Sequence, residues 1–176
     1  MTCIVGLVHE GKVTIGGDSA GVGGLDLVVR NDLKVWERDG LAFGFTTSFR
    51  MGQLLRYSLN IPKRHPDTDL MKFMVTDFID AVRKCLKDGG FARAKEGEEQ
   101  AGVFLVGHAG RLFRIDADYQ VGEAAAQFDA VGCGESFAKG ALYVSTGDAA
   151  ARVRKSLECA EAMSAGVRGP FHLVTV

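Results

Sequence analysis

Residues 2–18 read TCIVGLVHEGKVTIGGD. Two apolar runs rich in β-branched residues, 2–8 and 13–15, lie on either side of a short polar turn that contains glycine. Such a pair of runs is typical of a β-hairpin. The chain is therefore predicted to begin with two antiparallel strands, with Thr2 at the start of the first strand and Asp18 directly after the second.

Short apolar runs bounded by turn residues continue this strand pattern outward from the hairpin. The glycine-rich segment 19–24, which follows the hairpin directly, is predicted to be a loop. The further predicted strands are 27–29, 33–36, 41–43, 103–107, 112–115, 128–131 and 171–176.

Three- and four-residue spacing of apolar residues predicts helices elsewhere. The first begins at Ser48, carries Leu59 on its apolar face and is stopped by Pro62. The last two are predicted from Glu135 to Val144 and from Asp148 to Met163.

A second helix is predicted from the apolar spacing over residues 70–86. Asp67 or Thr68 could cap its start, and Gly89-Gly90 would end it. The charged segment 91–100 that follows is predicted to be a surface loop.

The order of elements is strands, two helices, strands, two helices and a final strand, without the βαβ alternation of a parallel sheet. This order favours an α+β fold, a four-layer αββα sandwich in which two antiparallel sheets lie between helix layers. With 176 residues the chain is predicted to form a single domain, 1–176, because roughly 150 residues per domain is usual.

The composition excludes several classes of function. A net charge of −1 gives no electrostatic basis for binding nucleic acid. No apolar stretch reaches the length of a membrane span and no cationic leader precedes the first strand, so a cytoplasmic protein without membrane contact is expected. The four cysteines and four histidines are dispersed, and residues 21–24 lack the GxGxxG spacing, so neither metal nor cofactor is predicted.

Thr2 is the strongest candidate for a catalytic residue. If Met1 is removed, as expected when a small residue follows it, Thr2 carries both a hydroxyl and a free α-amine. An α-amine has a reference pKa near 7.7–8.0 and can act as the base that activates the hydroxyl. Many ordinary proteins also begin Met-Thr, so this feature needs support from other residues.

Asp18 and Lys34 supply that support, because steps of sixteen residues separate Thr2, Asp18 and Lys34. A lysine close to the hydroxyl favours the alkoxide, and a carboxylate keeps the lysine charged and oriented. The alternative is an ordinary surface ion pair.

Three segments resemble the catalytic segments of proteasome β-type subunits and bacterial HslV, with matching spacing: 2–6, TCIVG; 16–18, GGD; and 33–35, LKV. Looser similarity continues over nearly the whole chain, at 44–48, at 130–135 and in the helix before the last strand. In its compactness the chain is more similar to HslV, or to the minor bacterial proteasome homologues, than to eukaryotic subunits.

The resemblance implies the N-terminal nucleophile hydrolase fold and a threonine endopeptidase. It implies that Thr2 is the nucleophile, that Lys34 lowers its pKa and that Asp18 orients Lys34.

Three further positions depart from the family pattern. Thr47 stands nearest to the family's glycine that donates an amide to the oxyanion, and Gly44 lies three residues earlier. Cys133 replaces a serine that supports the nucleophile amine within a Gly-Ser-Gly turn, and Ser164 is the nearest candidate for a second group supporting that amine.

The resemblance also implies partners and a substrate class. It implies a homo-oligomer of stacked rings, an ATP-driven AAA+ unfoldase that feeds it and polypeptide substrates. Gly21, Trp36, Phe45 and Phe49 resemble family pocket positions and suggest that apolar residues are admitted. Core packing is the alternative for Trp36 and Phe49.

Two other functions stay open. The chain could be a ring-forming structural homologue that keeps the fold without an exposed nucleophile. It could also be an N-terminal-nucleophile amidase that acts on small acyl substrates.

Overall fold

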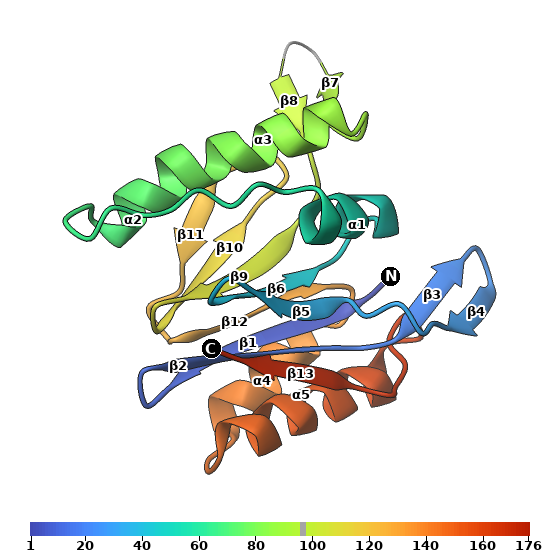
Figure 1. Ribbon diagram of the computed structural model, residues 1–176. Helices are drawn as coiled ribbons and strands as arrows, with labels where there is room; N and C mark the ends of the chain where they lie inside the picture. Colours follow the sequence, from blue (N-terminus) through green and yellow to red (C-terminus); the bar gives the residue numbers. More distant parts are fainter. Residues whose placement is uncertain (96–97) are drawn as a thin grey trace.

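Two antiparallel β-sheets stack face to face between two layers of helices in the computed structural model, which describes residues 1–95 and 98–176 (Figure 1). This is the αββα sandwich that the order of elements predicts. The first sheet has the strand order β12-β1-β2-β13 and comprises β12 (Phe128–Gly132), β1 (Cys3–His9), β2 (Lys12–Gly17) and β13 (His172–Thr175).

The second sheet has the order β11-β10-β9-β6-β5. Its edge strand β11 was not predicted, because three residues that include a glycine carry no apolar alternation. The five strands are β5 (Val35–Arg38), β6 (Leu41–Phe45), β9 (Phe104–His108), β10 (Arg111–Ile115) and β11 (Val121–Glu123).

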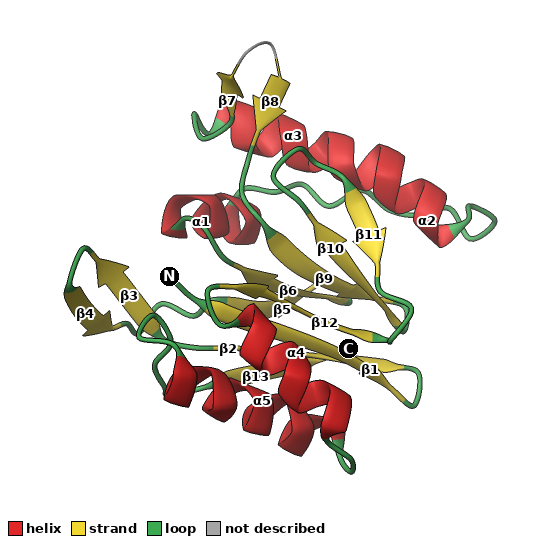
Figure 2. Ribbon diagram, turned by 180° about the vertical axis from the view of Figure 1, so that it is seen from behind, coloured by secondary structure: helices red, strands yellow, loops and turns green. Residues whose placement is uncertain are grey.

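Helices cover the outer face of each sheet (Figure 2). The β1 sheet packs against α4 (Glu135–Val144) and α5 (Ala149–Met163), which confirms both predicted helices. The second sheet is covered by α1 (Phe49–Tyr57) and by one long helical segment. That segment consists of α2 (Leu70–Phe73), a π-helical turn η1 (Met74–Phe78) and α3 (Ile79–Asp88).

Strand β1 is apolar along its length because both of its faces are buried. Cys3, Val5 and Leu7 pack against α4 and α5, whereas Ile4 packs between the two sheets. Side chains alternate between the faces of a strand, so an unbroken apolar run fits a strand in the interior of a sandwich.

The first helix is shorter than predicted. It begins after Ser48, whose hydroxyl accepts a hydrogen bond from Arg50 N at 3.1 Å, and it ends at Tyr57. Pro62 therefore does not stop it, because the chain leaves the helix at Ser58. Leu59 lies beyond the end of the helix but is still buried, so its apolar character matched the helical spacing.

The second helix has a different cap from the one predicted. Asp69, rather than Asp67 or Thr68, accepts a hydrogen bond from Lys72 N at 2.9 Å. The predicted end is confirmed, because Gly89 caps α3 and Gly90 has a φ of 69°. Such a positive φ is accessible to glycine at little cost.

Two segments that were predicted to be loops form strands of β-hairpins instead. Strand β3 (Ala20–Gly23) lies within the predicted loop 19–24 and pairs with β4 (Asp26–Val29) in a hairpin that projects from the body (Figure 1). In the predicted loop 91–100, β7 (Arg93–Lys95) pairs with β8 (Glu98–Gln100), while residues 96–97 lie outside the described residues.

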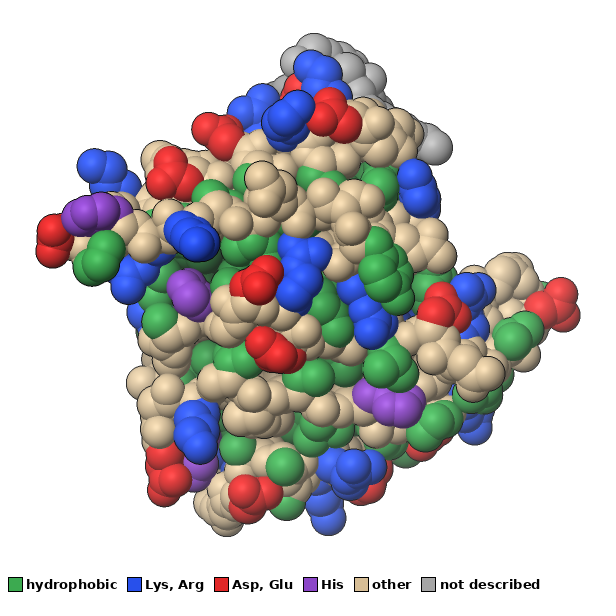
Figure 3. All heavy atoms as spheres, in the orientation of Figure 1, with side chains coloured by type: hydrophobic (Ala, Val, Ile, Leu, Met, Phe, Trp, Pro, Cys, Tyr) green, Lys and Arg blue, Asp and Glu red, His purple; other side chains and the backbone are tan. Residues whose placement is uncertain are grey.

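Basic and acidic side chains are interspersed over the face shown in Figure 3. Among the described residues, no helix is long and apolar enough to cross a bilayer.

Candidate active site

Five of the sequence-predicted site residues lie at strand ends on one side of the sandwich. Thr2 precedes β1, Asp18 follows β2, Lys34 precedes β5, Thr47 follows β6 and Cys133 follows β12. The antiparallel register brings these ends together. Cys3 pairs with Gly132 and Ile4 pairs with Gly17, so positions 2, 18 and 133 lie side by side.

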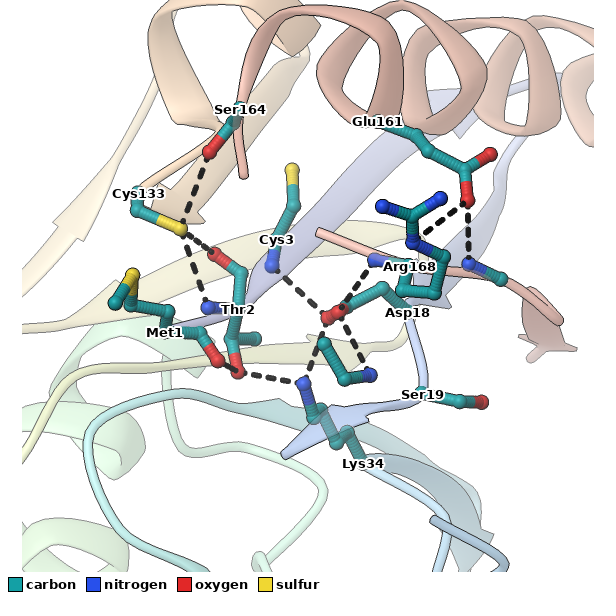
Figure 4. A network of polar contacts seen from close by, with 12 residues as sticks. Met1, Thr2, Cys3, Asp18, Ser19, Lys34, Cys133, Glu161, Ser164 and Arg168 are labelled. Carbon is teal, nitrogen blue, oxygen red and sulfur yellow. Dashed lines mark hydrogen bonds and ion pairs between the residues drawn. The ribbon is translucent and has the colours of Figure 1, made fainter. Parts of the chain in front are cut away.

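Asp18 is the most heavily bonded carboxylate of this site, and its side chain is fully buried (Figure 4). Oδ1 accepts hydrogen bonds from Cys3 N at 3.0 Å and from Lys34 Nζ at 2.8 Å. Oδ2 accepts from Ala20 N at 3.0 Å and from Arg168 N at 3.3 Å. These donors fix both oxygens, so the carboxylate has one orientation.

Lys34 is buried between Asp18 and Thr2. Its Nζ donates to Thr2 Oγ1 at 2.7 Å and to Asp18 Oδ1 at 2.8 Å. Burial lowers the pKa of Lys34 below its usual 10.5, and the charge and hydrogen bond of Asp18 oppose that shift. The Asp18 carboxylate therefore favours the charged ammonium next to the Thr2 hydroxyl.

The main chain around Thr2 is held by Cys133. Thr2 N donates to Cys133 Sγ at 3.3 Å, and Cys133 Sγ in turn donates to Thr2 O at 3.3 Å. Ser164 Oγ donates to Cys133 Sγ at 3.5 Å. Among the described contacts Ser164 thus reaches Thr2 through the thiol (Figure 4).

Gly132 allows this close approach of β12 to Thr2. Its φ is 102°, and a Cβ there would lie 2.3 Å from Thr2 O. No side chain fits at that distance, so the position requires glycine.

Cys3 lies beside this site but faces the helix layer. It is fully buried, and burial strongly raises the pKa of its thiol. A thiol in that environment stays protonated and is unreactive.

Thr47 adopts a strained backbone conformation, with a φ of 68°. A positive φ is rare for a β-branched residue and persists where surrounding contacts impose it. Its Oγ1 accepts from Val103 N at 3.1 Å, which holds the side chain. Within residues 1–95 and 98–176, Thr47 N–H has no hydrogen-bond acceptor, and Thr47 lines a cavity together with Thr2.

The four predicted substrate-binding residues do not all lie at the cavity that contains Thr2. Phe45 and Phe49 line the cavity that contains Thr2. Trp36 is 5% exposed and stacks on Phe43 with ring centroids 5.2 Å apart, which fits its core-packing alternative. Gly21 lies on β3, where a Cβ would be 2.6 Å from Cδ of Arg30.

Sequence reasoning missed Arg168 and Arg30. The main-chain N–H of Arg168 donates to Asp18, 150 residues away in the sequence. Any residue type can make a main-chain contact, so the sequence does not indicate this one. Arg30 lies with its guanidinium carbon 3.9 Å from the centre of the Phe49 ring, a contact that depends on how β3 and β4 meet α1.

Replacing Asp18 with asparagine is expected to lower the free energy of unfolding by about 3–5 kcal/mol, because it leaves the buried Lys34 ammonium without its counter-charge. Denaturant titration measures the loss. Asp88→Asn, which breaks the exposed Lys84–Asp88 pair (2.8 Å), is the control and should cost at most about 1 kcal/mol. Equal stability of Asp18→Asn and the unmodified chain would contradict a charged buried pair.

No protein-family model matches the sequence, and neither does any curated protein. Solved structures do match. BPH from Thiobacillus denitrificans, one structure of which is in complex with epoxomicin, is 18% identical with a TM-score of 0.82, over 99% of this chain and 97% of that chain. Eukaryotic HslV from Trypanosoma brucei is 18% identical with a TM-score of 0.69, over 98% of each chain.

A further match is a mutant of Anbu from Hyphomicrobium sp. strain MC1. It is 18% identical with a TM-score of 0.70, over 100% of this chain and 81% of that chain. The Anbu of another organism, Yersinia bercovieri, is described as an ancestral beta-subunit. These likenesses show that the chain has the proteasome-like fold of the N-terminal nucleophile hydrolases.

Proposed function

We propose that this chain is a threonine-type peptidase subunit, with residues 1–176 as one catalytic domain, that hydrolyses peptide bonds with the hydroxyl of Thr2. The observation that carries the proposal is the position of Lys34 Nζ, 2.7 Å from Thr2 Oγ1 and 2.8 Å from Asp18 Oδ1. Burying an ammonium is costly. An ammonium held against a hydroxyl stabilises the alkoxide that forms when the hydroxyl attacks.

Removal of Met1 completes the site in this proposal. With Met1 attached, Thr2 N is a peptide nitrogen, and Thr2 Oγ1 donates to Met1 O at 2.5 Å. Without Met1, the nitrogen becomes an α-amine and the hydroxyl loses that acceptor. The amine then lies next to its own hydroxyl and can accept the proton directly or through one water.

The reaction follows from these positions. Thr2 Oγ1 forms a bond to the substrate carbonyl carbon while its proton passes to the α-amine. The tetrahedral intermediate expels the amine half of the peptide, which takes that proton. Water, deprotonated by the α-amine, then attacks the ester. The Oγ1–carbon bond breaks as Oγ1 takes that proton back from the α-amine, which restores Thr2, and the new carboxyl group releases its own proton to solvent.

Thr47 supplies the oxyanion donor in this mechanism. Its N–H lacks an acceptor among the described residues, and Thr47 lines the same cavity as Thr2. Its Oγ1 is held by Val103 N, and the main-chain donor needs no particular side chain.

Cys133 and Ser164 would position the α-amine. We expect Cys133→Ala to lower kcat about three- to tenfold, the value of one hydrogen bond, because the amine loses the Sγ acceptor at 3.3 Å. Cys133→Ser restores an acceptor and should recover most of the rate. Steady-state kinetics at saturating substrate decide this, and an unchanged kcat in Cys133→Ala would contradict the positioning role.

Exposed apolar surface supports assembly into stacked rings of identical chains. Leu25 and Val28 of the projecting hairpin are 104% and 62% exposed. A groove of about 1060 Å³ along α4 and α5 is lined by apolar side chains that include Phe137, Val144 and Met163. Apolar surface of this kind commonly marks protein interfaces. An AAA+ unfoldase would then deliver polypeptide to the enclosed sites.

Hydrolysis assays test the proposed function. The protein, with removal of Met1 verified by intact mass, is incubated with fluorogenic peptides and with simple acyl amides. The proposal expects hydrolysis of the peptides. Hydrolysis of the simple amides alone would support an amidase. No hydrolysis by the Met1-free protein would support the structural homologue.

A further inference from the structure

Thr47 lies at the centre of a tight turn between β6 and α1. Ser48 N donates to Thr46 O at 2.7 Å, and the φ of Thr47 between them is 68°. A hydrogen bond of this kind around a residue of positive φ is typical of the classic γ-turn, which is rare and strained. Thr47 is exposed, so burial does not impose this conformation and other contacts must hold it.

A closed set of hydrogen bonds joins Thr46 and Thr47 to Val103. Val103 N donates to Thr47 Oγ1 at 3.1 Å, and Thr46 Oγ1 donates to Val103 O at 2.9 Å. The two hydroxyl oxygens lie 3.2 Å apart. Thr46 N also donates to Val103 O, at 3.0 Å. Both main-chain polar groups of Val103 therefore bind this turn.

The number of protons determines the direction of the contact between the two hydroxyls. A hydroxyl has one proton, and that of Thr46 goes to Val103 O, so Thr47 Oγ1 donates to Thr46 Oγ1. The Thr47 hydroxyl then has no proton left for a substrate oxygen. The donor that this turn offers to the cavity with Thr2 is the Thr47 main-chain N–H, which has no acceptor in the described part of the chain.

Gly102 lies directly against the side chain of Thr47. A Cβ at Gly102 would lie 2.7 Å from Thr47 Cβ and 2.9 Å from Thr47 Oγ1. Gly102 is itself buried, so the segment before Val103 has little room to move away. A larger residue at position 102 would therefore push the Thr47 side chain away from Val103.

We infer that the hydroxyls of Thr46 and Thr47 are positioning groups, which aim the Thr47 N–H at the substrate oxyanion by binding Val103. The inference rests on the proposed function of Thr2. Every residue except proline has a main-chain N–H, but a β-branched residue keeps a positive φ only where contacts impose it. Without these contacts Thr47 relaxes to a negative φ, and its N–H turns away from the oxyanion. The two side chains thus act on the reaction through the N–H.

Three replacements of Thr47 test this inference with a fluorogenic peptide. Thr47→Val keeps the β-branched shape without the hydroxyl, so kcat should fall about tenfold or more while KM stays within about twofold. Thr47→Ser keeps the hydroxyl, and Thr47→Gly adopts a positive φ without support, so both should stay within about threefold of the unmodified kcat. A hydroxyl that acted on the substrate directly would instead make the glycine variant as slow as the valine variant.

Gly102→Ala provides a second test of the same contact. Its Cβ should displace Thr47 and lower kcat about tenfold. Adding Thr47→Gly to Gly102→Ala should restore most of the rate, because the clashing Cβ of Thr47 is then absent and neighbouring changes are not additive. A double variant that is slower than Gly102→Ala alone would contradict the positioning role.

Labelling with a peptide vinyl sulfone separates positioning from general damage to the site. This reagent bonds to Thr2 Oγ1 through its carbon–carbon double bond and has no carbonyl oxygen at the reacting centre. The labelling rate should therefore be similar in the unmodified protein and in Thr47→Val. Thr175→Val, which removes one hydroxyl of the Thr14–Thr175 contact at 2.9 Å, is the matched control and should leave kcat and labelling unchanged.

Three results would overturn the inference while labelling of Thr2 in the unmodified protein upholds the proposed function. They are an unchanged kcat in Thr47→Val, an equal loss in Thr47→Val and Thr47→Gly, and a labelling rate that falls together with kcat. Neither hydrolysis nor labelling by the unmodified, Met1-free protein would overturn the proposed function and this inference together.

Discussion

Replacing Thr2 with alanine is expected to reduce peptide hydrolysis by about 10⁶-fold, to the detection limit, because the variant keeps the α-amine but has no attacking oxygen. The fold should survive. Lys34 loses a 2.7 Å hydrogen bond to Thr2 Oγ1 but keeps its ion pair with Asp18, so the expected loss of stability is about 1 kcal/mol. Initial rates with the fluorogenic peptide that the unmodified protein cleaves fastest measure the effect.

Thr2→Ser is the matched control for this prediction. Serine supplies the same hydroxyl and α-amine, so hydrolysis should continue within about two orders of magnitude of the unmodified rate. Residual activity in Thr2→Ala comparable with that of Thr2→Ser would mean that another group attacks the substrate.

Replacing Lys34 with methionine is expected to lower kcat by about 10²–10³-fold, the usual effect of removing one donor that stabilises developing negative charge. Methionine has a similar length and no charge, so Thr2 Oγ1 loses its cationic neighbour while the space stays filled. Because this change leaves Asp18 as an unpaired buried carboxylate, it should also destabilise the protein by about 3–5 kcal/mol.

The double variant D18N/K34M separates the two effects. Its stability should exceed that of Lys34→Met, since no buried charge is left unpaired, whereas its activity should stay as low. Recovery of activity in the double variant would contradict a catalytic role for the ammonium.

The pH dependence provides an independent check on Lys34. Burial lowers the pKa of Lys34 below 10.5, so the ammonium loses its proton at a lower pH than a free lysine does. The proposed mechanism requires the charged form of Lys34, so kcat/KM should fall with rising pH already below pH 10.5. A rate that stays constant up to pH 10.5 would show that the charge of Lys34 is not required.

The layers of the fold could be predicted because local patterns and tertiary burial agree. The strand β1 is buried on both faces, and its unbroken apolar run indicates this burial from the sequence alone. Helices α4 and α5 carry regular apolar spacing between clear boundaries, and their limits agree with the prediction to within one residue.

The wrong predictions concern a helix cap and a strand that the local sequence does not determine. Asp67, Thr68 and Asp69 are adjacent and all can cap a helix, so the cap is decided by where Leu70 becomes buried. The strand β3 contains two glycines and little apolar character, and it forms by pairing with β4.

The candidate site divides in the same way. Thr2, Asp18 and Lys34 lie at strand ends that are close to one another, and the spacing of the hairpin indicates this for the first two. Arg30 and Phe49 meet only because a projecting hairpin approaches the start of α1. No periodicity in the sequence indicates the contact between Arg30 and Phe49, so only the structure could show it.

The proposed reactive group consists of the α-amine and the hydroxyl of Thr2. Intact-mass measurement after incubation with a peptide vinyl sulfone, followed by peptide mapping, tests it most directly. We expect a chain that lacks Met1 and carries one adduct on Thr2, and no adduct in Thr2→Ala. A Met1-free chain that stays unlabelled, or an adduct that maps to Cys133 and persists in Thr2→Ala, would contradict it.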